Sequence, residues 1–329
     1  MRVINSSCRQ SVMGLIKYAY GHPRYLTRLP VPHPKPLTRK DMANTSNLKD
    51  FVVAEKSDGV RYLLCLGRYR ATHSPYAVLV NRKLEAFQLE VCCPADMYRG
   101  TVFDAELVLD KQQFLKLLVF DCAMFAGKSL RGAHFPARWA KVVGHFESPS
   151  AWNPQRCSRS LMRQLALSGK IIAENTLWMY AKQIMPISAH DLLRRTPLSH
   201  DSDGFVVTRS NCGLQAEMYK LKFVASIDVQ VGKGGTLLCR AEDKSLLPLT
   251  EALPDLDVQL RDCPEIPPGI LVELNVLSID GRTAVCAFHR IRTDKAAPNP
   301  VFVIKGVLQK VKESITPEEV WGLVGQRSA

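Results

Sequence analysis

A lysine followed by an Asp-Gly pair and an arginine is the first cluster of residue types that could do chemistry. The segment Glu55-Lys56-Ser57-Asp58-Gly59-Val60-Arg61 lies between two apolar stretches typical of strands, which places Lys56 at a turn. A phosphate-binding P-loop is excluded, because its lysine must begin a helix. Lys56 could act as a nucleophile, and a plain surface hairpin turn at Asp58-Gly59 is the alternative.

Two carboxylates and an aromatic ring follow along the chain. Asp104 and Glu106 are two residues apart in an expected strand, so both point to the same face, where they could bind a sugar hydroxyl or a metal. Phe120 ends the next apolar strand and is either a core residue or a plate for a nucleotide base. A polar strand face toward solvent is the alternative for the carboxylates.

Another acid and a pair of lysines come later. Asp203 lies at the mouth of a turn that leads into a strand. Lys220 and Lys222 share one face of the alternating segment 219–223, whose other face is apolar. Two neighbouring ammonium groups repel each other unless an anion lies between them, so this face favours a phosphate. A solvated surface face is again the alternative.

The last cluster is basic and lies near the end of a strand. Arg290 and Arg292 share a strand face, and Asp294, Lys295 and the dipeptide Pro298-Asn299 follow. Taken alone, this cluster would also fit an exposed strand end.

The order of these clusters resembles the covalent nucleotidyltransferases, a superfamily of messenger-RNA capping guanylyltransferases and polynucleotide ligases. The resemblance extends from about residue 50 to residue 300. Residues 55–63 and 294–299 resemble the capping form, since ligases tend to lack the Pro-Asn pair. The length resembles the compact stand-alone guanylyltransferases of large DNA viruses. Ala105 replaces the family's usual glycine between the two acids, and Cys286 replaces a common tryptophan.

The resemblance implies an mRNA guanylyltransferase. Lys56, as a neutral amine, would attack the α-phosphate of GTP, release pyrophosphate and become a lysyl-N-GMP intermediate. The 5′-diphosphate end of an RNA would then take the GMP and form the GpppN cap. An ATP-dependent polynucleotide ligase, of DNA or RNA, is the alternative, and a nucleic-acid-binding protein without activity is a third hypothesis.

The same resemblance implies a role for each clustered residue. Arg61 and Glu106 would hold the ribose, and Phe120 would stack on guanine. The metal, Mg²⁺ or Mn²⁺, would be bound by Asp203, with Asp104 or Glu106 as alternative ligands. The remaining nucleotide-binding residues would be Asp58, Lys220, Lys222, Arg290, Arg292, Asp294 and Lys295. Of these, residues 290–295 lie on the C-terminal domain, which would have to close over the nucleotide to touch its β- and γ-phosphates.

Composition agrees with a globular protein that meets a polyanion. The 329 residues are 46% hydrophobic and 23% charged, which excludes a disordered or fibrous chain, and no apolar run could span a bilayer. Residues 1–225 hold 32 of the 44 Lys and Arg residues but 17 of the 31 acids. The basic part would therefore meet nucleic acid or nucleotide phosphates.

The expected fold class is α+β with two domains. Residues 1–225 would form a nucleotidyltransferase domain of ATP-grasp-like antiparallel sheets and helices, with an extended basic N-terminal arm containing four alternating prolines. Residues 226–312 contain five expected strands, typical of an OB-fold barrel. Residues 313–329 would form a helix, capped by Thr316, that packs back on the first domain.

Partners and location are expected only in outline. The chain is too short for all three cap-forming activities, so a separate RNA triphosphatase and a cap methyltransferase are expected beside GTP and RNA. Ten cysteines without a C-x-x-C pair, and the lack of a secretory signal, favour a reducing intracellular compartment: nucleus or cytoplasm, of a host cell if the protein is viral. No membrane partner is expected.

Overall fold

The computed structural model describes the chain except for residues 1–5, 23–24, 45–49, 92, 148–154, 158–175, 223, 294, 314 and 327–329. It forms two compact units, one built from Met1–Lys35 and Asn47–Lys220 and the other from Pro36–Ser46 and Leu221–Gln326. The α-helices are α1 (Ser6–Tyr20), α2 (Arg39–Asn44), α3 (Phe135–Phe146), α5 (His190–Arg195), α6 (Leu249–Ala252), α7 (Val301–Glu313) and α8 (Pro317–Gln326). In the described part of the chain, no helix is both long and apolar enough to cross a membrane.

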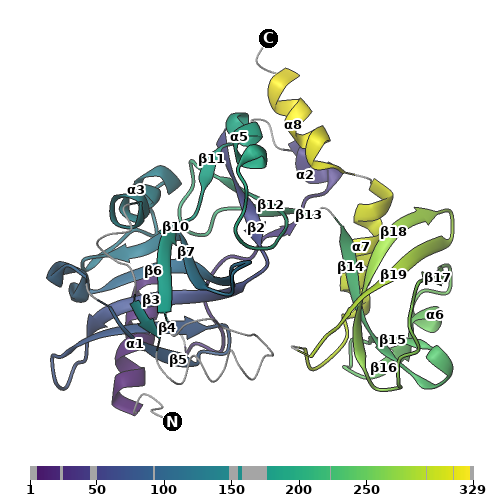
Figure 1. Ribbon diagram of the computed structural model, residues 1–329, viewed down its shortest axis with the longest axis horizontal. Coiled ribbons are helices and arrows are strands. Elements are labelled where there is room, and N and C mark those ends of the chain that lie inside the picture. Colours follow the sequence, from purple (N-terminus) through teal and green to yellow (C-terminus); the bar gives the residue numbers. More distant parts are fainter. Residues whose placement is uncertain are drawn as a thin grey trace. The chain divides into compact units, whose positions relative to one another are not determined.

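The first unit is dominated by an eight-stranded sheet in the order β10-β9-β5-β4-β3-β6-β7-β8, in which β10 also pairs with β7 (Figure 1). Its strands are β3 (Val60–Arg68), β4 (Pro75–Asn81), β5 (Ala86–Glu90), β6 (Thr101–Leu109), β7 (Leu115–Phe125), β8 (Lys128–Ser129), β9 (Gln155–Cys157) and β10 (Thr176–Ala181). Because the β10–β7 pairing joins two ends of the sheet, the strands enclose a core.

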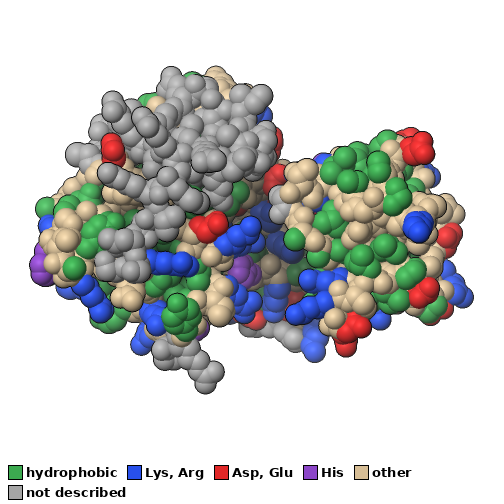
Figure 2. Space-filling model, turned by 90° about the horizontal axis from the view of Figure 1, so that it is seen from below, with side chains coloured by type: hydrophobic (Ala, Val, Ile, Leu, Met, Phe, Trp, Pro, Cys, Tyr) green, Lys and Arg blue, Asp and Glu red, His purple; other side chains and the backbone are tan. Residues whose placement is uncertain are grey.

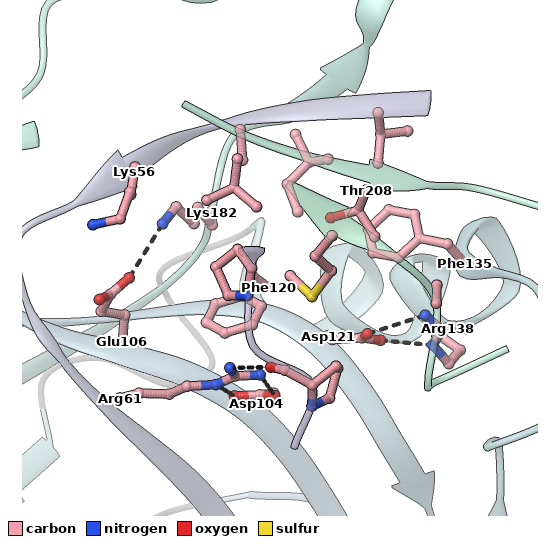
Figure 3. Close-up of a pocket in the computed structure, with 18 of the residues that line it drawn as sticks. Lys56, Arg61, Asp104, Glu106, Phe120, Asp121, Phe135, Arg138, Lys182 and Thr208 are labelled. Atoms are coloured by element: carbon pink, nitrogen blue, oxygen red, sulfur yellow. Dashed lines mark hydrogen bonds and ion pairs between the residues drawn. The ribbon is translucent and has the colours of Figure 1, made fainter. Parts of the chain in front are cut away.

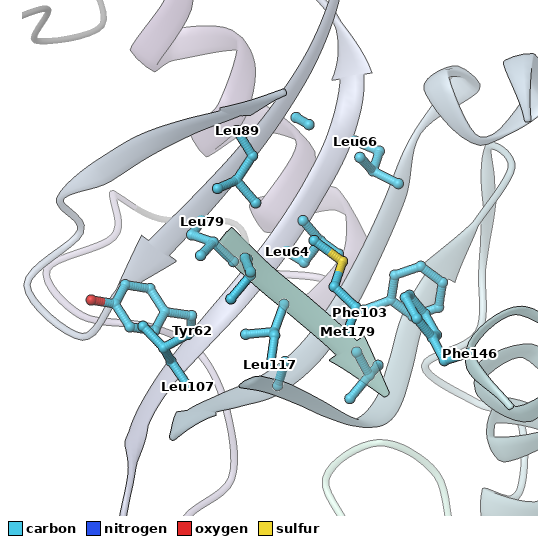
Figure 4. Close-up of a cluster of buried hydrophobic side chains, with 14 of the residues drawn as sticks. Tyr62, Leu64, Leu66, Leu79, Leu89, Phe103, Leu107, Leu117, Phe146 and Met179 are labelled. Carbon is cyan, nitrogen blue, oxygen red and sulfur yellow. The ribbon is translucent and has the colours of Figure 1, made fainter. Parts of the chain in front are cut away.

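Strand β3 is buried on both faces. Tyr62, Leu64 and Leu66 point into the core that the strands enclose, together with Phe103 and Phe146 (Figure 4). Leu63 and Cys65 point to the other face, where they meet helix α1. This double burial explains the unbroken apolar run of β3, since alternating polarity is expected only where one face meets water.

A second sheet of the first unit carries the lysine turn. Its strand order is β1-β13-β12-β2-β11, and the strands are β1 (Lys35–Pro36), β2 (Phe51–Ser57), β11 (Ile184–Pro186), β12 (Ser202–Arg209) and β13 (Met218–Lys222). The boundary between the two units falls inside β13, after Lys220.

The second unit is a six-stranded sheet in the order β16-β15-β14-β18-β19-β17. Its strands are β14 (Ala225–Val231), β15 (Leu237–Arg240), β16 (Leu246–Pro248), β17 (Asp257–Arg261), β18 (Leu271–Asp280) and β19 (Thr283–Ile291). Helix α7 packs on this sheet through Ile304 and Leu308 (Figure 1). The five strands expected for the OB-fold barrel are present, with β16 as an additional short strand, and the predicted α+β class is confirmed.

The N-terminal arm differs in part from the expectation. Residues 29–34 run without regular structure, as the alternating prolines predict, but Ser6–Tyr20 form a helix instead of an extended arm. The reason is a helical apolar stripe: Val12, Ile16 and Ala19 are each 0% exposed and pack on the sheet. The expectation gave weight to the positive charge and the prolines and missed this 3.6-residue period.

Between residues 134 and 200, strand-like residues at 177–181 and helix-like spacing at 190–195 predict a strand and a helix, and β10 and α5 lie there. The helix that the spacing of residues 159–167 predicts lies outside the described residues. Thr316 caps α8, because its Oγ1 accepts a hydrogen bond of 3.2 Å from the backbone nitrogen of Glu319. Helix α8 also meets α2 of the same unit, through an ion pair between Glu319 and Arg39.

Candidate active site

Lys56 lies near the end of β2, and its ammonium group meets a carboxylate of the paired strand. The distance from Lys56 Nζ to Asp203 Oδ1 is 2.7 Å, and the two side chains are 22% and 32% exposed. The register of β12 against β2 shifts between Ser202 and Phe205, a bulge that contains Asp203. Bulges redirect side chains at functional sites, and this one accounts for an acid that points toward Lys56.

Gly59 explains why the turn after Lys56 needs a glycine. A Cβ atom at this position would lie 2.7 Å from both the Cγ of Glu106 and the backbone oxygen of Leu107. The turn can therefore approach strand β6 only without a side chain, and this approach brings Lys56 and Glu106 to one place. Asp58, in the same turn, is exposed, and its backbone nitrogen bonds to the carbonyl oxygen of Asp201.

A buried ion pair lies below the lysine turn. Arg61 Nε and Nη2 donate to the two oxygens of Asp104 at 2.8 and 2.5 Å, and the side chains are only 7% and 3% exposed. The third contact of Arg61 runs from Nη1 to the backbone oxygen of Pro32, at 2.6 Å. Burial alone would lower the pKa of Arg61, but the Asp104 carboxylate outweighs it and raises the pKa.

A second buried cation, Lys182, stands just after β10. Its Nζ donates to Ser57 Oγ at 2.8 Å and lies 3.2 Å from Glu55 and 3.5 Å from Glu106. His200 Nε2 lies 3.0 Å from the other oxygen of Glu55. Glu55 and Ser57, the two neighbours of Lys56 in the chain, are therefore held in one buried polar network with Lys182 and His200.

Phe120 lies between these two cations. Its ring centroid is 5.3 Å from the Arg61 guanidinium and 5.7 Å from Lys182 Nζ, and Figure 3 shows the ring between them. Cations near an aromatic face hold the ring in place. Phe120 is half-buried and lines the pocket, so it is part of the pocket wall and not a buried core residue.

The far wall of the pocket is built from α3 and the middle of β7. Arg138 Nε donates to Asp121 Oδ1 at 2.8 Å, and Arg138 is 1% exposed (Figure 3). Burial raises the pKa of Asp121 above its ordinary value, although Arg138 counteracts the effect. Phe135, on the same helix, completes this wall.

All these side chains surround one pocket, which we call the nucleotide pocket. Its empty volume is about 980 Å³, a figure that includes space open to solvent. The charged and aromatic residues that line it are Glu55, Lys56, Arg61, Arg82, Asp104, Glu106, Phe120, Asp121, Phe135, Arg138 and Lys182. Five sequence-predicted site residues are therefore brought together here, and Asp203 joins them through its contact with Lys56.

The lysine pair of β13 has the expected alternation. Lys220 and Lys222 are half-buried, whereas Tyr219 and Leu221 on the other face are 3% and 1% exposed. The two lysines therefore share a face, as predicted from the sequence.

The C-terminal basic cluster lies in the second unit and is paired with acids of its own sheet. Arg292 Nη1 lies 2.7 Å from Asp228 and 3.1 Å from Glu273, and Arg290 Nε lies 2.8 Å from Glu273. Lys295 also pairs with Asp228. Asn299 fixes this arrangement, because its Oδ1 accepts a hydrogen bond from the backbone nitrogen of Asp228. Asp294 lies outside the described residues.

The residues proposed for a metal fit only in part. Both oxygens of Asp104 accept hydrogen bonds from Arg61, which argues against Asp104 as a ligand. Among the described residues, no three His, Cys, Asp or Glu side chains gather in a way that could hold an ion. Of the other two carboxylates, Asp203 pairs with Lys56 and Glu106 with Lys182.

Sequence reasoning missed Lys182, Glu55 and His200. Lys182 is isolated in the sequence, between the clusters at Phe120 and Asp203, with no motif around it. Glu55 is adjacent to Lys56, so its position next to the candidate nucleophile was a usable signal. His200 is 145 residues from Glu55 in the chain, and no local pattern indicates the pairing.

Replacing Glu55 by glutamine should lower the free energy of unfolding by about 2 kcal/mol at pH 7, the usual size for a buried hydrogen bond to a charged group. Burial would raise the pKa of Glu55, but Lys182, His200 and Ser57 outweigh it and lower the pKa below 4.5. The ionised carboxylate therefore stabilises the fold above pH 4.5, and this stabilisation disappears as the pH falls through the lowered pKa.

Urea denaturation at pH 7 and at pH 4 and below measures this effect. The difference between wild type and Glu55→Gln should shrink as the pH falls, while the exposed substitution Glu90→Gln should change little at any pH. A difference that stays constant down to pH 3 would contradict the assignment.

Comparison with known proteins gives a family and weak structural likenesses. A family model described as mRNA capping enzyme, catalytic domain, matches residues 3–224. A search of curated proteins found no match. A solved structure from a study of Lig E DNA ligases is 14% identical with a TM-score of 0.32, covering 80% of this chain and 98% of that chain. A structure named Pmar-Lig_Pre is 13% identical with a TM-score of 0.35, covering 84% of this chain and 71% of the other. Likenesses at this level carry no argument about activity.

Proposed function

Since the chain belongs to the family of mRNA capping enzyme catalytic domains, we propose that it is an mRNA guanylyltransferase that works through a lysyl-N-GMP intermediate. The observation that carries this proposal is the position of Lys56, whose Nζ lies against Asp203 at a pocket with Glu106, Phe120 and Lys182 in its walls. A covalent transfer from a nucleoside triphosphate requires one amine, carboxylates, an aromatic ring that can stack on the base, and buried cations.

In the first half-reaction, the Lys56 ammonium gives up a proton to solvent, and the neutral Nζ amine attacks the α-phosphorus of GTP and loses a second proton to solvent. The N–P bond forms as the bond from phosphorus to the bridging α,β oxygen breaks, and pyrophosphate leaves with that electron pair. Asp203 accepts a hydrogen bond from Nζ and fixes the direction of attack. A divalent ion bound with the nucleotide would neutralise charge on its phosphates. Lys220 and Lys222 would add positive charge, and Phe120 would stack on the guanine.

In the second half-reaction, a terminal oxygen of the RNA 5′-diphosphate attacks the same phosphorus. The N–P bond breaks, Lys56 regains a proton, and the product is a 5′–5′ triphosphate link. Glu106, half-buried beside Lys182, is the carboxylate placed to accept hydrogen bonds from ribose hydroxyls. Three of the Arg61 donors are already bound to Asp104 and Pro32, so we assign Arg61 to building the pocket wall.

Incubation with α-labelled GTP or ATP and Mg²⁺ or Mn²⁺, followed by denaturation, tests the proposal. Acid-labile label from GTP should remain on the chain, and transfer to RNA with a 5′-diphosphate should release it. Label from ATP alone would favour the ligase alternative. No label from either nucleotide would contradict both enzymatic functions.

A further inference from the structure

A second pocket, which we call the strap pocket, lies at the end of α1 in the first unit. The residues that line it come from the end of α1, the segment 26–33 and one later residue: Tyr20, Gly21, His22, Leu26, Thr27, Arg28, Leu29, Pro30, Val31, His33 and Gln215. Gln215 closes it by donating from Nε2 to the backbone oxygen of Pro30, at 3.3 Å. None of these described lining residues is an acid, whereas Arg28, His22 and His33 are bases.

A further arginine reaches the wall of the strap pocket. A Cβ atom on Gly21 would lie 1.6 Å from Arg131 Nη1, so the Arg131 guanidinium rests directly on the glycine that lines the pocket. Gly21 has a φ of +65°, a conformation that itself favours glycine. Because Gly21 has no side chain, the Arg131 guanidinium can lie against the wall of the strap pocket. It is the fourth basic group there, after Arg28, His22 and His33.

The strap pocket shares a wall with the nucleotide pocket. Pro32 and Pro34 line the nucleotide pocket, and Val31 and His33 line the strap pocket. Alternate residues of an extended segment face opposite sides, so this wall is a single chain thick. The hydrogen bond from Arg61 to Pro32 holds the wall on the nucleotide side. Any phosphate in the strap pocket would thus lie beside the site that holds Lys56.

The electrostatics of His33 show that positive charge gathers at this wall. Burial and the neighbouring Arg61, Arg82 and Arg28 lower the pKa of His33. The cations disfavour a further proton, and an anion between them would relieve the repulsion. Lys and Arg side chains are also spread over the face of the molecule in Figure 2.

We propose that the strap pocket binds phosphate groups of the RNA that receives the guanylate. This inference rests on the proposed function, because only the acceptor strand must bring phosphates to the neighbourhood of Lys56 after pyrophosphate has left. Arg28, which lines the pocket, holds the phosphates, and Arg131, which rests on Gly21, adds positive charge next to the wall. The prolines of the wall keep the two binding sites apart. The chemistry recognised is a phosphodiester or terminal phosphate on a flexible single strand.

The test uses the full chain with Arg28→Ala, Arg131→Ala and the control Arg68→Ala, an exposed arginine outside both pockets. Binding of a short RNA with a 5′-diphosphate is followed by fluorescence anisotropy at several salt concentrations. Each pocket variant should weaken binding about tenfold and reduce the slope of log K against log salt by about 0.7, the value for one single-strand phosphate contact. Arg68→Ala should change neither quantity.

Separate half-reactions distinguish this inference from the proposed function. Arg28→Ala should raise the KM for RNA in transfer from preformed adduct, while adduct formation from GTP changes less than twofold. Equal KM values for Arg28→Ala and Arg68→Ala, with normal adduct formation, would overturn the strap pocket alone. Failure of the wild-type chain to form any adduct would overturn the proposed function instead.

Two further comparisons define the ligand. If internal phosphates occupy the pocket, Arg28→Ala and Arg131→Ala should weaken the binding of RNA with a 5′-hydroxyl as well. If the terminal phosphates occupy it, these variants should weaken the binding of the 5′-diphosphate RNA alone. In wild type, RNA should raise the pKa of His33 measured by NMR, because a phosphate stabilises the imidazolium form. Competition of GTP with RNA for this shift would show that a second nucleotide occupies the pocket, which would overturn the RNA assignment.

Discussion

Replacement of Lys56 by arginine should lower labelling of the chain by α-labelled GTP at least about 1000-fold, to background. Arginine keeps the positive charge that faces Asp203, at 2.7 Å in the native pair, so the ion pair that joins β2 to β12 can persist. It cannot supply a neutral amine, because the guanidinium stays protonated at any working pH. The loss therefore reports the nucleophile and not the folding of the pocket.

The matched control is Lys83→Arg, which replaces an exposed lysine of the same unit outside the nucleotide pocket. It should label as wild type does. Lys56→Ala should also lose labelling, but it removes the ion pair with Asp203 as well as the amine and so tests two features together. Circular dichroism should show the Lys56→Arg chain folded as wild type.

Label retained on Lys56→Arg would place the nucleophile elsewhere. Lys182 would be the next candidate, since it is the other lysine that lines the nucleotide pocket. Its side chain is 5% exposed, and its Nζ is held by Ser57, Glu55 and Glu106. An amine engaged in this way is poorly placed to attack, which is why Lys56 is the assignment. Peptide mapping of the label would decide between them.

Much of the site could be predicted from the sequence because its parts are local. The turn at Asp58-Gly59 and the alternation around Lys220 follow from two-residue periodicity and turn chemistry, and both are present in the structure. The paired acids Asp104 and Glu106 also line the same pocket, as their spacing requires. Patterns of this kind depend on neighbours in sequence and need no knowledge of the fold.

The parts that could not be predicted depend on contacts between distant segments. Lys182 reaches Ser57 across 125 residues, and His200 reaches Glu55 across 145. Asp104 was expected at a metal or a ribose, but its partner is Arg61, which the pairing of β3 with β6 brings beside it. Residue type alone cannot reveal whether a carboxylate meets a ligand or a buried guanidinium.

The pair of Arg61 and Asp104 supplies the second large effect, on stability. Replacing Asp104 by alanine should lower the free energy of unfolding of the first unit by about 3–5 kcal/mol, the usual cost when one partner of a buried ion pair is removed. Arg61 is 7% exposed and remains charged, so the substitution leaves an uncompensated guanidinium in the wall of the pocket. Urea denaturation followed by circular dichroism measures the loss.

The exposed ion pair of Asp255 and Arg282 provides the control. Its atoms are 2.9 Å apart, but the side chains are 89% and 71% exposed, so Asp255→Ala should change the denaturation midpoint little. Comparable losses for Asp104→Ala and Asp255→Ala would contradict the role of burial. The contact distance does not distinguish the two ion pairs, since both contacts are short.

A double substitution separates stability from activity. Arg61→Leu together with Asp104→Leu removes both charges, and buried ion pairs replaced by apolar side chains often recover stability. The double variant should therefore be more stable than Asp104→Ala alone. It also removes the hydrogen bond to Pro32 that holds the wall between the two pockets. Adduct formation should consequently stay impaired in a chain that has regained its stability. If the double variant recovers both stability and adduct formation, Arg61 serves only the fold. If it recovers neither, the pair of Arg61 and Asp104 fixes the geometry of β3 against β6.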